Sequence, residues 1–208
     1  DYTNSFCGIL WQLKKEYRVM SNILVVIPAY NEEKSICGVV DSLGTAGIDV
    51  DYVIINDCSL DGTRAICRNK GYNIINLPVN LGLGGGVQTG YQYAVEKGYD
   101  IVVQLDGDGQ HDPAYIKGIV TPIIEGKADM VIGSRFLERE GFQSSSMRRL
   151  GIGVLKRVIK LCCGTTVQDC TSGFRAVSRP IATLFASQYA HDYPEPEAII
   201  LAVLNGYR

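Results

Sequence analysis

The stretch "VVQLDGDGQHDP", residues 102–113, joins an apolar run to two carboxylates, Asp106 and Asp108, with glycines beside them. Short strands made almost wholly of apolar residues are typical of parallel sheets, because helices cover both faces of such a sheet. In open α/β sheets, ligands bind at the carboxyl ends of the strands. The stretch therefore predicts a buried strand that presents Asp106 and Asp108 at the ligand-binding edge.

The rest of the chain repeats this alternation of strand and helix. Periodicity and β-branched content predict strands at 22–28, 51–57, 72–78, 100–106 and 129–134. Helical patterns lie between them, near 32–44, 60–70, 84–97 and 112–126. We therefore expect an α/β fold with a doubly wound, mostly parallel, Rossmann-like sheet and helices on both faces.

Composition sets the class of protein. The 208 residues are 46% hydrophobic and 20% charged, which is typical of an ordinary globular domain. A formal net charge of −2 provides no general attraction to nucleic acid. Seven scattered cysteines without a CxxC pair favour reduced, cytosolic thiols over disulfides or zinc. Residues 1–19 lack the features of a signal peptide, and no apolar run is long enough to span a membrane.

The domain organisation follows from where this pattern changes. We expect an N-terminal extension at 1–19 and a single domain at 20–208. Within that domain, 20–135 carries the regular alternation and is predicted to bind the nucleotide. Residues 136–208 are less regular and are predicted to form an acceptor half. A chain that begins at Asp1 and stops at Arg208 without a helix stop signal favours a fragment, truncated at its C-terminus.

The carboxylate pair predicts a metal site. Residues i and i+2 of an extended chain point the same way, roughly 7 Å apart, and at an effective dielectric constant of 20 their charges repel by about 2 kcal/mol. Mg²⁺ or Mn²⁺ offsets this repulsion and prefers carboxylates together with substrate phosphates. Gly107 and Gly109 allow a turn and the approach of a bulky ligand. The alternative is a solvated turn rich in Asp and Gly. Asp112 and Pro113 then predict the N-cap and first turn of the next helix.

Six segments together resemble the family 2 glycosyltransferases, most closely the dolichyl- and polyprenyl-phosphate sugar transferases and the bacterial cell-surface polysaccharide enzymes. In order, they read "VVIPAYNEEKSI", "VIINDCSLDGT", "NLGLGGGVQTGYQYA", "VVQLDGDGQHDP", "DMVIGSRF" and "DCTSGFRAVSR". The resemblance covers about 22–180 and continues at "YPEPEAI". It implies the GT-A fold, a nucleotide-sugar donor such as a UDP-, GDP- or dTDP-sugar, a Mg²⁺ or Mn²⁺ ion, and an inverting transfer.

The resemblance also assigns roles to residues of the nucleotide half. It implies that the metal is held by Asp106, Asp108 and Gln110, and that Asp108 is also catalytic. It implies donor contacts from Pro28, Ala29, Tyr30, Glu32, Asp57, Gly84, Gly85, Asp106 and Gln110. Asn56 and Cys58 depart from the Asp-Asp-Gly-Ser that the family usually carries around Asp57.

Three of these assignments have alternatives in the residues themselves. Asn31 is a good N-cap, with Glu32 favoured by the helix dipole, so this segment also predicts the start of a helix. Asp57 can be a plain turn residue. The glycines of 81–90 resemble a dinucleotide-binding loop, but the third glycine falls early and the loop belongs to the third strand–helix unit rather than the first.

The remaining predicted residues are Arg135, the last residue of the nucleotide half, and residues of the acceptor half. Arg135 is suited to bidentate contact with a phosphate, with a surface ion pair as the alternative. Asp169 matches the family's acceptor-side segment, but it can also pair with Arg175 as a loop staple. Glu197 lies in the first turn of a final helix and is a candidate general base. A hydroxyl acceptor needs such a base, whereas a lipid phosphate is already ionised and needs cations; Arg135, Arg148, Arg149 and Arg175 provide them.

The basic segment 147–161 has apolar residues at helical spacing and is either a membrane-surface helix or a helix packed on the sheet. We therefore expect a metal-dependent inverting glycosyltransferase at the cytosolic face of a membrane. Its expected acceptor is a polyprenyl phosphate or a lipid-linked glycan. The alternatives are a nucleotide-sugar-binding scaffold without catalysis and, with less support, a sugar-phosphate nucleotidyltransferase.

Overall fold

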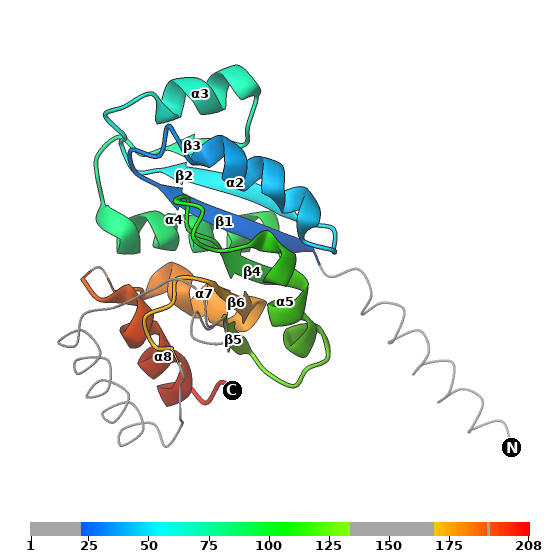
Figure 1. Cartoon of the computed structure of the whole chain (residues 1–208). Helices are drawn as coiled ribbons and strands as arrows, with labels where there is room; N and C mark the ends of the chain where they lie inside the picture. Colours follow the sequence, from blue (N-terminus) through cyan, green and yellow to red (C-terminus); the bar gives the residue numbers. More distant parts are fainter. Residues whose placement is uncertain (1–21, 134–168, 191) are drawn as a thin grey trace, which may run out of the picture.

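The computed structural model describes residues 22–133, 169–190 and 192–208, and the predictions for 1–19, Arg135 and 147–161 lie outside these ranges. Six strands of the described residues form one sheet in the order β3-β2-β1-β4-β6-β5 (Figure 1). Their bounds are Ile23–Ala29 (β1), Asp51–Asn56 (β2), Ile74–Asn76 (β3), Ile101–Gln104 (β4), Met130–Ile132 (β5) and Arg175–Ser178 (β6).

The sheet is mostly parallel, as predicted, with one exception. The neighbours from β3 through β2 and β1 to β4 are parallel, whereas β6 is antiparallel to both β4 and β5. All five predicted strands are present within their predicted ranges or one residue beyond. Strand β6 was missed, because its four residues, Arg-Ala-Val-Ser, contain no β-branched run. It comes from the predicted acceptor half and lies inside the sheet.

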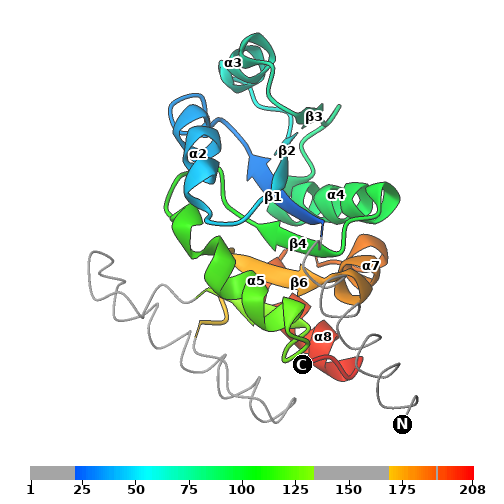
Figure 2. The same cartoon turned by 90° about the vertical axis from the view of Figure 1, so that its right-hand side faces the viewer.

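Helices cover both faces of the sheet, as expected. Figure 2 shows α2 and α5 on one face and α4 and α7 on the other. The four helices predicted up to residue 126 are present, although α2 begins four residues later than expected. The α-helices are Ile36–Ser42 (α2), Thr63–Lys70 (α3), Gly82–Lys97 (α4), Ile116–Ile124 (α5), Arg179–Ser187 (α7) and Pro194–Leu204 (α8), with 3₁₀ turns at Leu43–Thr45 and Pro113–Tyr115.

Strand β1 divides the core into two layers. All seven of its residues are buried. Successive side chains of a strand point to opposite faces. Ile23, Val25 and Ile27 therefore pack into the layer with α2 and α5, and Leu24 and Val26 pack into the layer with α4 and α7. This double burial explains why the strand sequence is apolar without alternation.

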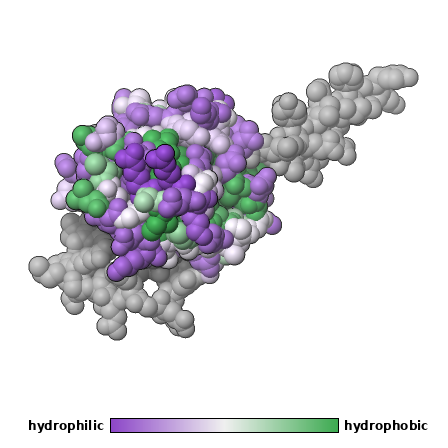
Figure 3. Space-filling view, turned by 90° about the horizontal axis from the view of Figure 1, so that it is seen from above, coloured by the Kyte–Doolittle hydropathy of each residue, from purple (hydrophilic) through white to green (hydrophobic). Residues whose placement is uncertain are grey.

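On the face that carries α3, hydrophilic residues separate small hydrophobic patches (Figure 3). The described residues thus form no continuous apolar surface on this face. Among the residues that the structure describes, no helix is both long enough and apolar enough to cross a membrane.

Candidate functional site

The site lies where the strand order reverses. From β1 the chain moves outward to β2 and β3, and α4 then returns it to β4 on the other side of β1. Such a switch point leaves a crevice at the carboxyl ends of the two central strands. The loop after β4 packs on the end of β1, since the Gly107 N–H donates to the Pro28 carbonyl at 3.3 Å. A Cβ at Gly107 would lie 2.9 Å from that oxygen, so this close approach needs glycine.

The loop after β1 is joined to the loop after β2. The Asn31 N–H donates to Ser59 Oγ at 3.0 Å, and the Leu60 N–H donates to Asn31 Oδ1 at 2.8 Å. Asn31 adopts a left-handed φ of 59° to make this contact. The prediction that Asn31 caps a helix is therefore wrong: α2 begins only at Ile36, because Asn31 is committed to the neighbouring loop.

The other predicted donor residues of the first loop differ in their surroundings. Pro28 and Ala29 are buried in β1, whereas Tyr30 is 46% exposed beside the crevice. The Glu32 N–H donates to Thr63 Oγ1 at 2.8 Å, and the Glu32 carboxylate accepts a hydrogen bond from Ser35 Oγ. Tyr30 is thus the most accessible of these four side chains.

Asp57 is buried where three loops meet. It is 5% exposed, and its Oδ1 accepts from the Leu81 N–H at 2.6 Å. Its own N–H donates to the Ala29 carbonyl at 2.9 Å. The next residue, Cys58, has a left-handed φ of 57°, a conformation that glycine adopts more readily than other residues. Asp57 therefore connects the ends of β1 and β2 to the start of α4.

The glycines predicted beside the nucleotide lie in the first turns of α4. Gly84 and Gly85 are both buried. A Cβ at Gly85 would overlap the Leu81 side chain. Further along the helix, a Cβ at Gly90 would overlap Val26 of β1. The absence of a side chain at Gly85 and Gly90 therefore makes room for Leu81 and Val26 of the protein itself.

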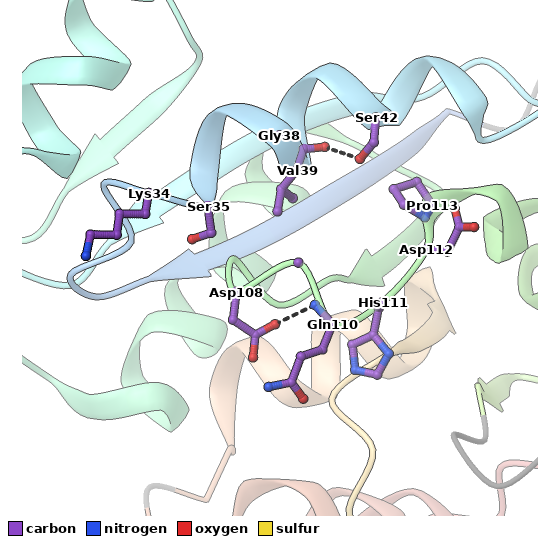
Figure 4. A pocket seen from close by; sticks show the side chains of 11 residues that line it. Lys34, Ser35, Gly38, Val39, Ser42, Asp108, Gln110, His111, Asp112 and Pro113 are labelled. Carbon is purple, nitrogen blue, oxygen red and sulfur yellow. Dashed lines mark hydrogen bonds between the residues drawn. The ribbon is translucent and has the colours of Figure 1, made fainter. Parts of the chain in front are cut away.

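The two carboxylates lie on a turn. Strand β4 ends at Gln104, two residues before its predicted end, and the chain turns at 107–109 as the two glycines predicted, so the extended spacing assumed for Asp106 and Asp108 is wrong. Gly109 has a φ of 77°. Asp108 is exposed, and its Oδ1 accepts from the Gln110 N–H at 2.9 Å. The two predicted ligands Asp108 and Gln110 both point away from α2 (Figure 4).

Asp106 is more enclosed than Asp108. Its Oδ1 is buried without a hydrogen-bond partner in the described part of the chain. Its Oδ2 lies 3.6 Å from His111 Nε2. Buried polar atoms are nearly always satisfied, so an orphaned carboxylate oxygen at a ligand-binding edge indicates a missing cationic or hydrogen-bonding partner.

The segment 169–174, which leads into β6, packs against Asp106. A Cβ at Gly173 would lie 2.7 Å from Asp106 Oδ1 and closer still to Oδ2. The neighbouring Phe174 ring stacks on His111, with ring centroids 5.3 Å apart and an interplanar angle of 19°. Sequence reasoning missed Gly173, Phe174 and His111 as site residues. The glycine and aromatic of "TSGFR" were the available signal.

Arg135 and the predicted acceptor-half residues are only partly described. Asp169 is 1% exposed, and its Oδ1 accepts from both the N–H and the Oγ1 of Thr171 at 3.1 Å. Glu197 lies in the first turn of α8, as its sequence position predicted, and its side chain is exposed. Arg135 lies outside the described residues. Glu197 is thus accessible to a substrate, whereas the Asp169 carboxylate supports its own loop.

A pocket of about 530 Å³ opens beside the Asp108 turn. It lies between α2 and the residues that follow β4 (Figure 4). Its polar lining includes Lys34 and Ser35 on one side and Asp108, Gln110 and Asp112 on the other. The Asp112 carboxylate accepts from the Ala114 N–H at 2.9 Å, with Pro113 in the first turn, which confirms the predicted cap.

The interior beneath the site contains tyrosines with altered acidity. Burial raises the pKa of Tyr189 to about 12; the charge of Arg175 opposes this shift, and the charges of Glu195 and Asp106 add to it. Burial also raises the pKa of Tyr91 well above its ordinary value. The charges of Arg175, Glu195 and Asp106 therefore all act on one buried phenol.

The carboxylate turn can hold a hard divalent cation. Within residues 22–133, 169–190 and 192–208, no three His, Cys, Asp or Glu side chains form a preassembled metal cluster. Asp106, Asp108 and Gln110 nevertheless present oxygen ligands at one turn. Mg²⁺ and Mn²⁺ are commonly bound by one or two carboxylates, with waters and substrate phosphates completing the shell. The donor set fits such an ion.

Comparison with known proteins agrees with this geometry. The sequence profile described as glycosyl transferase family 2 matches residues 24–185. A UDP-N-acetylglucosamine–dolichyl-phosphate N-acetylglucosaminyltransferase of Methanococcus voltae is 34% identical over 203 residues, covering 88% of this chain and 80% of that one. An undecaprenyl-phosphate mannosyltransferase of Micrococcus luteus is 30% identical, covering 74% and 65% of the two chains.

A solved structure shows the same fold. It is glucosyl-3-phosphoglycerate synthase from Mycobacterium tuberculosis in complex with Mn²⁺, UDP-glucose and phosphoglyceric acid. The TM-score is 0.68 at 22% identity, covering 92% of this chain and 68% of that one. Since the family profile spans most of the chain and the relatives align over most of their own length, this chain belongs to glycosyl transferase family 2 and is a glycosyltransferase of GT-A fold.

Proposed function

We propose that this glycosyltransferase moves a sugar from a nucleotide-sugar donor to a polyprenyl phosphate, with inversion at the anomeric carbon and with a bound divalent metal ion. The observation that carries the metal and donor assignment is the orphaned Asp106 Oδ1 beside the exposed carboxylate of Asp108. The acceptor assignment is supported by the relatives, which are named for dolichyl phosphate and undecaprenyl phosphate.

The donor contacts follow from the crevice. Tyr30 is accessible at its rim, and Glu32 and Asp57 lie in the two joined loops, with Pro28 and Ala29 beneath and Gly84 and Gly85 at the start of α4. Asp106, Asp108 and Gln110 would hold Mg²⁺ or Mn²⁺ against the donor diphosphate. When bound, the metal neutralises charge that develops on the nucleoside diphosphate.

The transfer itself is a displacement. An acceptor oxygen forms a bond to the anomeric carbon, and the bond from that carbon to the diphosphate oxygen breaks, with the electron pair leaving on the nucleoside diphosphate. A phosphate acceptor is ionised at neutral pH and needs no general base. Arg135 is assigned to phosphate contact. Asp169 and Glu197 are assigned to the acceptor side, where the exposed Glu197 would serve as a base only for a hydroxyl acceptor such as a lipid-linked glycan.

We place the reaction at the cytosolic face of a membrane, where a polyprenyl phosphate presents its headgroup. On this proposal residues 20–135 bind the donor and 136–208 bind the acceptor. The basic segment 147–161 would contact the anionic surface. Comparing UDP-, GDP- and dTDP-sugars identifies the nucleotide base of the donor and its sugar.

The test measures donor binding by the wild-type chain and by Asp108→Asn. Binding is detected as a rise in Tm with UDP-, GDP- and dTDP-sugars, each with and without Mn²⁺. A ligand at 100 times its Kd adds about 2.7 kcal/mol, which raises Tm by about 5–11 °C for a chain of this size. The shift should require Mn²⁺ and disappear in Asp108→Asn. Asp112→Asn is the matched control, because asparagine preserves the N-cap and should retain the full shift.

Transfer is then measured as labelled sugar moved to undecaprenyl phosphate in detergent. A donor shift that survives Asp108→Asn would contradict the metal assignment. Donor turnover to water alone, with no transfer to the lipid phosphate, would contradict the acceptor assignment. Binding without any turnover would favour the scaffold alternative.

A further inference from the structure

The buried cation of β6 occupies a central position in the fold. Arg175 is fully buried and is the largest of the fully buried side chains among the described residues. It lies opposite Gln104, the last residue of β4, and opposite Ile132 of β5. The guanidinium therefore lies beside Gln104, two residues before Asp106. A buried charge is costly unless it is well hydrogen-bonded. The hydrogen bonds of Arg175 explain why a cation is tolerated at this buried position.

Those contacts join two segments that are distant in sequence. Arg175 Nη2 donates to the Ser172 carbonyl at 2.5 Å, within the 169–174 segment. Arg175 Nη1 donates to the Glu195 carbonyl at 3.2 Å, in the first turn of α8. The planar fork of arginine can make both bonds at fixed geometry, which a lysine ammonium cannot reproduce. The side chain therefore fixes α8 relative to the 169–174 segment.

The 169–174 segment in turn contacts the metal-binding turn. Gly173 follows Ser172 directly and touches the Asp106 carboxylate. Phe174 stacks on His111, whose Nε2 lies 3.6 Å from Asp106 Oδ2. A displacement of Ser172 therefore reaches Asp106 through one residue. Arg175 is buried away from solvent and acts through these neighbours.

One donor of the guanidinium, the Nε–H, makes no hydrogen bond within the described part of the chain. Arg175 Nε and Gln104 Oε1 are both buried without a hydrogen-bond partner in the described part of the chain. They belong to directly opposite residues of an antiparallel pair, whose side chains point to the same face of the sheet. A complementary donor and acceptor therefore lie on neighbouring positions beneath the site, which favours a role in the site over simple filling of the core.

We propose that Arg175 is a positioning residue of the transfer site: its guanidinium holds the 169–174 segment and the first turn of α8 in one arrangement and so fixes the wall that orients Asp106. The inference rests on the proposed function for its catalytic consequence. The structural part, the joint ordering of two segments by one side chain, stands on the hydrogen bonds themselves.

The test compares Arg175→Lys with the matched control Arg179→Lys, the same chemical change at an exposed residue four positions later. Mn²⁺ affinity is measured in the presence of UDP or GDP, far below the melting temperature, where a merely structural role would leave it unchanged. We expect Arg175→Lys to weaken Mn²⁺ binding by about 10–100-fold, the effect typical of residues that orient a metal ligand. Arg179→Lys should bind as the wild type does.

Hydrogen exchange supplies a readout that does not need turnover. In Arg175→Lys, amides of 169–174 and of 195–199 should exchange faster together, whereas loosening of one segment alone would overturn the inference. Mn²⁺ affinity within twofold of the wild type would overturn it too. If Arg175→Lys does not fold, the same measurement is made on the wild type. Adding Mn²⁺ with UDP or GDP must then slow amide hydrogen exchange in both segments, and slower exchange in only one of them refutes the coupling.

The same experiment separates the two proposals. A wild-type chain that binds no Mn²⁺–nucleotide and transfers no sugar contradicts the proposed function. Joint loosening of both segments in Arg175→Lys would still support Arg175 as the residue that orders them, and independent exchange would refute it.

Discussion

Gly173→Ala tests how the 169–174 segment orients the carboxylate of Asp106, which we propose binds the metal. The new Cβ would lie 2.7 Å from Asp106 Oδ1 and 2.9 Å from Asp106 Cγ, closer than real Cβ contacts allow. The backbone of Gly173 is not left-handed, so alanine introduces no conformational strain there, and the collision is the whole perturbation. Either the Asp106 side chain rotates away or the segment retreats.

Both responses have a cost that can be estimated. Overpacking costs about 1–3 kcal/mol, and alanine returns about 0.4–1 kcal/mol by restricting the unfolded chain. The net loss, on the order of 1–2 kcal/mol, corresponds to a fall in Tm of about 2–8 °C. Displacing Asp106 should weaken Mn²⁺ binding by about 10–100-fold, equivalent to about 1.4–2.8 kcal/mol.

The assay is Mn²⁺ titration with thermal unfolding, and Gly118→Ala is the control. Gly118 lies in α5 with nothing near its missing Cβ, so alanine should leave Mn²⁺ binding unchanged and add up to about 1 kcal/mol of helix stability. If Gly173→Ala binds Mn²⁺ like Gly118→Ala, the contact with Asp106 does not orient the carboxylate, and the reasoning fails.

Three further predictions concern the loops, the core and the buried phenol. Asp57→Ala leaves the Leu81 N–H without its acceptor and should cost about 1–3 kcal/mol in urea unfolding, whereas Asp57→Asn keeps an acceptor and should cost less; equal stability of the two would contradict the assigned bond. Gly90→Ala drives a Cβ into Val26 and should destabilise by about 1–3 kcal/mol, lowering the urea midpoint, and an unchanged midpoint would show that α4 can shift freely. The pKa of Tyr189 is about 12 in the fold and 10.0 in a model peptide, so its contribution is fully present below pH 10 and is lost as pH rises toward 12, at about 1.4 kcal/mol per pKa unit. Tyr189→Phe should therefore lose less stability than the wild type between pH 9 and pH 11.5, and parallel curves would refute the assignment.

Local patterns predicted much of the fold because its signals are local. The apolar runs around Val25 and Val103 identify strands covered on both faces, and Asp112-Pro113 identifies the start of the following helix. The six motifs predicted the glycosyltransferase family, which the family profile confirms. Asp106, Asp108 and Gln110 could be predicted as candidate ligands from the sequence because they follow a strand within one short stretch.

The errors arose where a distant contact overrides a local preference. Asn31 has the chemistry of an N-cap, but its Oδ1 accepts from the Leu60 N–H, and α2 starts later. Strand β6 has weak local propensity and forms because β4 and β5 flank it on either side. The family pattern drew attention to Asp169 and Glu197, but nothing in the pattern indicated that the first is buried and the second exposed.

The sequence by itself determined the strand–helix alternation, the family and the carboxylates at the end of β4, because each is encoded within a window of a few residues. Only the tertiary structure decided which side chains surround those carboxylates. Gly173 lies 67 residues after Asp106 and packs against its carboxylate because β6 runs antiparallel beside β4, and the same pairing brings Phe174 onto His111. The physical reason is that burial and steric contact depend on chain segments brought together by folding, which no local pattern records.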